Sequence, residues 1–346
     1  MTALEKARNA PFQVKLIGAF AAVYIVWGST YLAIRLVMES MPAFLSVGLR
    51  FLFAGILMIG WGLVTGAKLP SLRQTGRAGL VGFMLLFLGT GSVVWAAFHL
   101  NSGLIALLVA MEPLWLTLLL WGWPGGHRPT WLHWLGIAVG FAGAAVLALP
   151  GGATLAGSAV HLPSVVVLTV GCLFWAGGSL IGRGDGMPVA ASWSSGLQML
   201  GGGAALVVFG LFRGEWAAFR PENVTWTSVA AFIYMIVFGS LLAFSAYTWL
   251  MRNVDPTMVA THTFVNPVVA VFLGWWIRDE PVSSRTLAAT ALIVVSVLFT
   301  IVGERRRQKA EKAAAAPPAK AEQPERAVAR EQIEACDADL AMAEAR

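Results

Sequence analysis

Long uninterrupted runs of apolar residues dominate this chain, and they recur at short intervals from about residue 14 to residue 303. Each run has about twenty residues, which is the length that a helix needs to cross roughly 30 Å of hydrocarbon at 1.5 Å per residue. Strands of a transmembrane β-barrel would be shorter and would alternate apolar with polar residues. The pattern therefore predicts an all-α integral membrane protein.

The apolar runs predict ten transmembrane helices. The expected spans are residues 14–34, 44–64, 79–99, 103–123, 131–150, 163–182, 192–212, 226–250, 258–277 and 285–303. The first run is not typical of a cleavable signal peptide, because its apolar stretch is too long and no small-residue cleavage site follows. Residues 1–13 are then a cytoplasmic segment. The Ala-, Glu-, Lys-, Arg- and Pro-rich residues 304–346 are expected to form a disordered, charged cytoplasmic tail.

Composition and charge support a membrane protein and fix its orientation. Only 12% of the residues are charged, against about 25% in soluble domains. The formal net charge of +6 does not indicate nucleic acid binding, because Lys and Arg concentrate in alternate loops. With the N-terminus inside, the inner segments up to residue 309 carry thirteen of them and the outer loops five. This positive-inside pattern predicts that both termini are cytoplasmic.

The two halves of the chain repeat a pattern of residues. Trp27 is matched by Trp175 at an offset of 148 residues, and Arg50 by Gln198 at the same offset. Because each half has five spans, the second half must enter the membrane in the opposite orientation. Inverted repeats of this kind are typical of secondary transporters. We therefore expect two five-helix repeats, over residues 14–150 and 160–303.

Three stretches resemble EamA-type members of the drug/metabolite transporter superfamily. They are VYIVWGSTYLAIRLVMESMPAFLSVGLRFLFAG, LLVAMEPLW and FVNPVVAVFLGWWIRDEP. The resemblance covers roughly residues 14–303 and is greatest to the bacterial inner-membrane metabolite and drug exporter branch. It implies a multi-pass protein of the bacterial inner membrane, with a central pathway between two repeats for the efflux of small metabolites. One departure is Gly126-His127-Arg128-Pro129, which stands in the first half where the second half has the acidic turn Asp279-Glu280-Pro281.

Glu112 and Pro113 lie near the middle of the apolar run 103–123. An ionisable residue at that depth is a candidate for function by default. Glu112 could exchange a proton as a cavity alternates between the two sides, which would couple transport to the proton gradient. The alternative is a permanently protonated side chain that bonds the carbonyl group freed by the proline. Pro113 is expected to bend the helix in either case.

The second half has Asn266 and Pro267 at the equivalent depth, at an offset of 154 residues. Asn266 cannot titrate, so only the first half could carry a proton at this position. Pro267 predicts a second bent helix near the midplane, where transporters of this type place their binding site. His262 lies one helical turn before Asn266 and is a further candidate for contact with a proton or a substrate.

Four more residues complete the candidates for the pathway. Arg50 lies about six residues into the second span, and it either attracts an anionic or zwitterionic substrate group or forms a structural pair. Gln198 at the matching position could bond a substrate or a neighbouring helix. Trp27 and Trp175 lie deep in their spans and could line an aromatic-walled pathway. Packing between helices is the alternative for both.

Other classes of function lack their motifs. The sequence has no Walker motif for ATP binding, no HExxH motif and no GxSxG motif. We therefore expect neither a cofactor nor a metal, and we do not expect an enzyme. The expected function is secondary transport of a small molecule, namely an amino acid, a related metabolite or a drug. An intramembrane enzyme or a passive channel is the alternative. Besides the lipid bilayer, the expected partners are the substrate and protons. Runs of small residues such as GGGAAL would also serve a homodimer.

Overall fold

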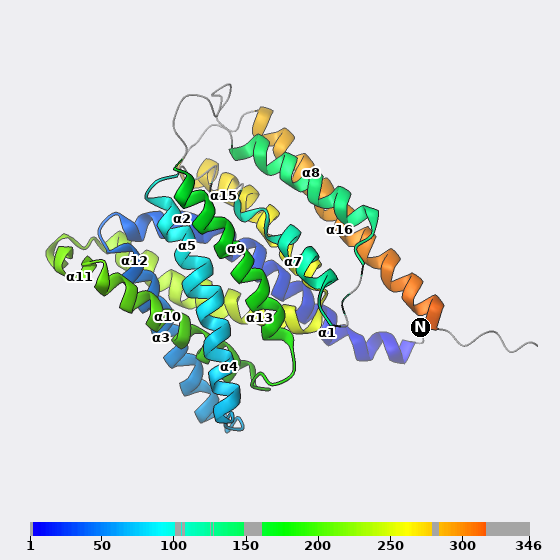
Figure 1. The fold of residues 1–346 in the computed structure, drawn as a ribbon, viewed down its shortest axis with the longest axis horizontal. Coiled ribbons are helices and arrows are strands. Elements are labelled where there is room, and N and C mark those ends of the chain that lie inside the picture. The colour runs from blue at the N-terminus through cyan, green and yellow to red at the C-terminus, as the bar shows by residue number, and fades with distance from the viewer. Residues whose placement is uncertain are drawn as a thin grey trace, which may run out of the picture. The chain divides into compact units, whose positions relative to one another are not determined.

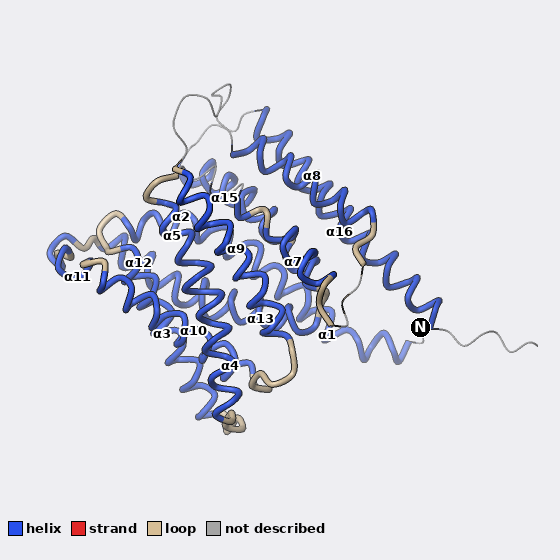
Figure 2. Tube along the Cα trace, viewed as in Figure 1, coloured by secondary structure: helices blue, strands red, loops and turns tan. Residues whose placement is uncertain are grey.

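The computed structural model describes residues 3–100, 105, 108–124, 126, 128–148, 161–278 and 284–315. Within these residues every regular element is a helix (Figures 1 and 2). The chain divides after Glu304 into two units. The first unit, residues 1–304, carries the structure described below. The turn Asp279-Glu280-Pro281 and His127, which the sequence singles out, lie outside the described residues.

Five groups of helices make up the first half of the chain. They are α1 (Ala3–Ala21) with the π-helical segment η1 (Ala22–Val26) and α2 (Trp27–Met38), then α3 (Ala43–Val64), then α4 (Leu72–Gly82) with the π-helical segment η2 (Phe83–Thr90) and α5 (Gly91–Ala97), then α7 (Glu112–Trp121), and finally α8 (Trp131–Ala148).

The second half follows a similar order. It consists of α9 (Leu162–Arg183), α10 (Ala191–Phe212), the short α11 (Glu215–Ala218) and 3₁₀-helix η3 (Pro221–Asn223), α12 (Trp226–Tyr234) with the π-helical segment η4 (Met235–Phe244) and α13 (Ser245–Asn253), α14 (Pro256–Ala260), α15 (His262–Arg278) and α16 (Ser284–Ala315).

Six helices among the described residues are long and apolar enough to cross a membrane. They are Phe12–Met38, Ala43–Val64, Leu72–Ala97, Leu162–Arg183, Ala191–Phe212 and Trp226–Asn253. Each falls on one of the predicted spans. The other four predicted spans fall on α7, α8, α14 with α15, and α16, so a count of ten remains a prediction.

The chain is helical beyond the predicted spans at both ends. The first helix already begins at Ala3 rather than near residue 14. The last helix continues to Ala315, through residues 304–315, where a disordered tail was expected. These residues include Ala, Glu, Lys, Arg and Gln, which favour helix. Residues 316–346, with Cys336, lie outside the described residues.

Two of the predicted spans are interrupted, the first near its middle and the second near its start, six residues before Pro267. In the first half, α7 begins at Glu112 after a turn at Ala110 and Met111. Pro113 therefore lies in the first turn of a helix, where its missing N–H group leaves no hydrogen bond unmade. In the second half, α14 ends at Ala260 and α15 begins at His262, with Pro267 within α15.

The two halves meet along α3 and α10, whose backbones touch at glycines. A Cβ atom on Gly48 would lie 2.9 Å from the carbonyl oxygen of Gly203, and one on Gly55 would lie 2.9 Å from that of Gly196. Gly48 and Gly196 are 148 residues apart, and so are Gly55 and Gly203. The two contacts are thus related by the internal repeat. Only residues without a side chain allow two helices to approach this closely.

A carboxylate from the second half holds the start of α3. Pro42, which precedes this helix, makes no side-chain cap. Instead the backbone N–H groups of Phe44 and Leu45 donate to the two carboxylate oxygens of Glu215, over 3.1 and 2.9 Å. A negative charge at a helix N-terminus satisfies free N–H groups and complements the helix dipole. The loop after α10 is thereby fixed to the first half.

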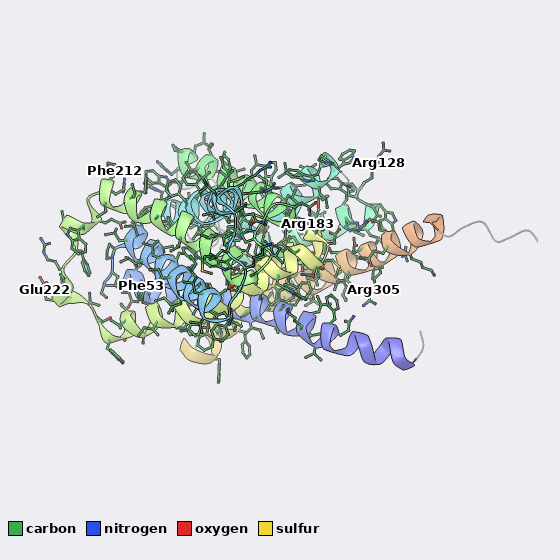
Figure 3. The ribbon with its side chains drawn as sticks, turned by 90° about the horizontal axis from the view of Figure 1, so that it is seen from below. Phe53, Arg128, Arg183, Phe212, Glu222 and Arg305 are labelled. Atoms are coloured by element: carbon green, nitrogen blue, oxygen red, sulfur yellow. The ribbon has the colours of Figure 1, made fainter. Side chains whose placement is uncertain are left out.

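The ends of the helices can be followed in Figure 3, where Phe212 and Glu222 lie at one end and Arg128 toward the other. We define the outer end as the end that carries the Glu39–Pro42 loop and α11, following the predicted orientation. The inner end carries the loops at residues 65–71 and 184–190.

Gly82 offers a test of this packing, because a Cβ atom there would lie against the backbone carbonyl group of Gln198 on α10. Gly82→Ala should lower the free energy of unfolding by about 1–3 kcal/mol, since neither backbone can yield easily. Thermal unfolding of the purified protein in detergent measures the effect. Gly79→Ala on the same helix meets nothing within 4 Å and should be neutral or slightly stabilising. Equal effects of the two changes would contradict the packing.

Candidate functional site

A cavity of about 150 Å³ lies within the first unit, and both halves of the chain line it. By the same measure one water molecule needs roughly 10–15 Å³, so the space suits a small organic molecule or a group of waters. The predicted candidates that line it are Trp27, Arg50, Glu112, Trp175, His262 and Asn266.

Glu112 faces His262 inside this cavity. The Oε2 atom of Glu112 lies 3.9 Å from Nε2 of His262, and both side chains are buried. The other ring nitrogen, Nδ1, lies 2.9 Å from the carbonyl oxygen of Val259. This contact sets the direction of the ring, so that Nε2 faces the carboxylate. The second carboxylate oxygen, Oε1, has no hydrogen-bond partner among the described residues. A buried polar atom without a partner costs free energy, so this oxygen is available to a proton, a water or a ligand.

Aromatic rings surround the pair of Glu112 and His262. The centroid of the Trp27 ring lies 5.1 Å from that of His262, 5.1 Å from that of Tyr247 and 5.9 Å from that of Trp175. Tyr247 in turn lies 5.6 Å from both Trp175 and His262. These distances are typical of edge-to-face and tilted ring contacts. The four rings form one continuous cluster, of which Trp27, Trp175 and His262 line the cavity.

Two of the π-helical segments, η2 and η4, position the tryptophans of this aromatic cluster. Trp27 Nε1 donates to the carbonyl oxygen of Gly239 in η4, over 3.1 Å. Trp175 packs against Gly89 in η2, where a Cβ atom would lie 2.8 Å from the Trp175 ring. Each tryptophan therefore lies against a glycine of the opposite half. A π-helix leaves the usual hydrogen-bond ladder and is frequent at functional sites.

Arg50 also lines the cavity, although it is only 7% exposed. Its guanidinium group lies 4.3 Å from the centre of the Phe51 ring, and Nη1 donates to the sulfur of Met235 over 3.2 Å. Nε has no partner, and no ion pair of Arg50 is found among the described residues. A buried cation without a counter-ion is costly. The side chain is therefore suited to an anionic group that enters the cavity.

Asn266 closes another part of the wall with its amide group. Oriented with Nδ2 as donor, it bonds the carbonyl oxygens of His262 and Tyr24, each over 3.1 Å. The hydroxyl groups of Tyr24 and Thr261 lie 2.5 Å apart beside it. Thr261 occupies the turn between α14 and α15, so this network joins the interrupted helix to the π-helical segment η1.

Gln198 does not line the central cavity. It lies in a separate cavity of about 10 Å³, together with Ser179, Tyr247 and Thr248. Its Nε2 atom donates to the hydroxyl group of Ser194 over 3.1 Å. The equivalent residues Arg50 and Gln198 thus lie in different cavities.

Several residues of the site carry no clear signal in the sequence. Tyr247 is one of several deep aromatic residues, yet its hydroxyl group accepts from Trp175 Nε1 over 2.9 Å and lies 2.7 Å from that of Ser179. Met235, whose sulfur accepts a hydrogen bond from Arg50 Nη1, is an ordinary apolar residue in the sequence. Gly89 and Gly239 are two of 37 glycines, although their spacing of 150 residues is close to the repeat offset.

The comparisons with known proteins agree with this picture. The EamA-like transporter family matches residues 15–149 and again residues 162–302. The chain is 37% identical over 291 residues to the "Uncharacterized inner membrane transporter YedA" of Escherichia coli, covering 84% of this chain and 91% of that protein. It is 26% identical over 320 residues to the "Uncharacterized transporter YvbV" of Bacillus subtilis, covering 91% and 97%.

A more distant relative is the "Probable terminal-alkyne amino-acid exporter" of Streptantibioticus cattleyicolor, 23% identical over 307 residues, with 84% of this chain and 96% of that protein covered. A solved crystal structure superimposes with a TM-score of 0.71 at 21% identity, covering 85% of this chain and 98% of the other. At this identity the likeness shows the fold alone.

Asn266→Asp tests the orientation of the amide. A carboxylate would place acceptors against the two carbonyl oxygens that the amide now satisfies, so the variant should lose about 1–3 kcal/mol of stability, measured by thermal unfolding in detergent. Asn253→Asp is the matched control, because its amide also donates to a carbonyl oxygen, that of Trp249, but at an exposed position. If both variants unfold at the parent temperature, the assigned orientation is wrong.

Proposed function

Because the chain belongs to the EamA-like transporter family, we propose that it is a secondary active transporter that exports small metabolites or drugs by alternating access. The protein is a multi-pass transporter of the inner membrane, as the family and the similarity to YedA show. Mechanism, direction and substrate are the parts that we propose.

We propose ten transmembrane helices in two inverted repeats, residues 14–150 and 160–303, with both termini inside. Each of the two family matches covers one of these halves. The reciprocal glycine contacts of α3 and α10, and the two tryptophans that pack against glycines of the opposite half, support a pseudo-twofold relation between the repeats. An odd number of spans per repeat gives this relation an axis in the membrane plane.

One observation carries the proposal of transport through the central cavity. Glu112 and Arg50 line the same cavity, both are buried, and each has an atom without a hydrogen-bond partner. In a soluble core such groups would be paired, because each unmade bond costs about 1–3 kcal/mol. A cavity that holds the two side chains unpaired is suited to a ligand that supplies a hydrogen-bond partner to each of them.

The chemistry of the cavity favours an amphoteric substrate. A carboxylate would pair with Arg50, and an ammonium group would lie between Glu112 and the faces of Trp27 and Trp175. A purely cationic drug would satisfy Glu112 but leave Arg50 unpaired. Amino acids and related compounds meet both requirements, and one relative is named as a probable amino-acid exporter. That name also supports the outward direction.

We propose that Glu112 carries the coupling proton. It faces His262 at 3.9 Å, and its Oε1 atom is unbonded, so a proton and a substrate ammonium group would compete for the same carboxylate. Competition of this kind couples the movement of one species to that of the other. The relatives are named as transporters, and we propose no enzymatic activity.

Glu112→Gln tests the coupling. The amide cannot bind or release a proton, so uptake driven by a pH gradient in reconstituted liposomes should fall at least about tenfold, whereas exchange of substrate without a gradient should persist. The assay uses a panel of labelled amino acids and dyes, with the gradient imposed in both directions.

Glu222→Gln changes an exposed carboxylate outside the cavity and should transport like the parent. Full gradient-driven transport by Glu112→Gln would refute the coupling and leave transport itself intact. If no solute moves in the parent under either gradient, the proposed function fails.

Arg50→Gln tests the contact with a carboxylate, and it places in the first half the residue that the second half has. A charged hydrogen bond contributes about 1.5–3 kcal/mol, so the KM of a transported amino acid should rise at least about tenfold. The KM of its uncharged amide derivative should change little. Arg220→Gln, at an exposed loop position, is the control. Equal losses for both substrates would exclude a carboxylate contact.

A further inference from the structure

The small cavity around Gln198 is the repeat counterpart of the outer part of the central cavity. Thr30, Ile34 and Arg50 line the central cavity toward its outer end. Their counterparts 148 residues later are Gly178, Gly182 and Gln198, and all three line the small cavity. One residue of overlap could be chance, but three counterparts on two helices place the two cavities at equivalent positions in the two halves.

The inverted repeat puts these equivalent positions at opposite ends of the helices. Arg50 lies near the outer start of α3, and Gln198 lies near the inner start of α10. The outer position belongs to a cavity of about 150 Å³, whereas the inner one holds about 10 Å³. In an inverted repeat, exchanging the conformations of the two halves exchanges the two sides. The inner cavity would then widen as the outer one narrows.

Tyr247 separates the two cavities. Its ring packs against Trp27, Trp175 and His262 of the central cavity, and Tyr247 also lines the small cavity. The hydroxyl group bonds Trp175 and Ser179 on α9. The side chain is fully buried, at 1% exposure. Tyr247 therefore joins α13 to α9 and closes the space between the candidate site and the small cavity.

Further hydrogen bonds hold the inner side together. The hydroxyl groups of Ser195 and Thr248 lie 2.9 Å apart. Arg252 donates to the Ser194 hydroxyl group over 2.7 Å and to the carbonyl oxygen of Pro188 over 3.0 Å. These contacts join α13 to α10 and its preceding loop. They are individually weak enough to exchange for water when the helices separate.

We propose that the small cavity is the inner half of the transport pathway, closed here by Tyr247, and that Gln198 lines this half as Arg50 lines the outer half. The proposal rests on the proposed transport function. It assigns Gln198 a place in the pathway in the inward-facing state, where its amide meets the passing molecule in place of a guanidinium group.

Cysteine labelling of the full-length chain tests the proposal without a known substrate. In a background in which Cys172 and Cys336 are replaced by Ala, single variants Arg50→Cys and Gln198→Cys are treated with a membrane-impermeant maleimide in right-side-out and inside-out vesicles. Gln198→Cys should react only from the inner face and Arg50→Cys only from the outer face. Thr248→Cys and Thr30→Cys repeat the pair with smaller changes, in case either first variant does not fold.

Tyr247→Phe supplies the decisive comparison. Loss of the two hydroxyl contacts should shift the equilibrium toward the inward-facing state, raising the labelling rate of Gln198→Cys and Thr248→Cys from the inner face roughly fivefold or more. The outer positions should react no faster, and they should slow only as far as the outward-facing population falls. Tyr234→Phe is the matched control, because it removes a hydroxyl contact with Ser29 on α2 near the outer end and should leave the inner rates unchanged. Leu242→Cys, exposed on η4, reports reaction of thiols outside the pathway.

The inner pathway is overturned if Gln198→Cys and Thr248→Cys stay unreactive from the inner face in the presence of Tyr247→Phe while Arg50→Cys or Thr30→Cys reacts from the outer face. It is also overturned if Tyr234→Phe changes the inner rates as much as Tyr247→Phe does. Reciprocal labelling supports it even when no solute of the panel moves, a result that would count against the proposed substrates alone.

Discussion

The cost of an unpaired buried charge is the constraint on which the centre of this protein depends. Glu112 and Arg50 are buried in a chain with six helices long and apolar enough to cross a membrane among its described residues, and hydrocarbon tolerates neither charge alone. Both side chains line one cavity, within which His262, Thr30 and Asn266 are among the polar groups. These two residues thus require the cavity, which is also the proposed place for a substrate.

Such a cavity needs rigid surroundings, and the close packing of α3 against α10 at glycines provides them. The close contacts of α3 with α10 leave no room for a side chain at Gly48, Gly55, Gly196 or Gly203, so these helices form a seam that cannot separate without losing its packing. The interrupted helices are different. A turn at Ala110–Met111 directly precedes α7, and a turn at Thr261 separates α14 from α15. Under the proposed alternating access, motion is therefore expected at the interrupted helices and at Tyr247, with the contact between α3 and α10 as the fixed part.

The sequence predicted what depends on local composition. Six apolar runs are helices that could cross a membrane, because length and hydrophobicity act within a single segment. The turn before Glu112 could not be predicted from the sequence, because the residues on both sides of it within the run 103–123 are apolar. Contacts between segments were also out of reach. The match of Trp27 with Trp175 suggested equivalent places, but that their rings touch depends on how α2 and α9 cross.

Gln198 shows most clearly how an inverted repeat should be interpreted. At the position that matches Arg50, the sequence leaves Gln198 as a contact for a substrate or for a neighbouring helix, and the two residues line different cavities. Inversion about an axis in the membrane plane keeps together only residues that lie near the axis. Glu112 and Asn266, at the middle of their spans, both line the central cavity, whereas Arg50 and Gln198, nearer the starts of theirs, line different cavities, as the proposed inversion would place them. In the proposed inverted repeat, depth in the span therefore decides whether two matched residues line one cavity or two cavities on opposite sides.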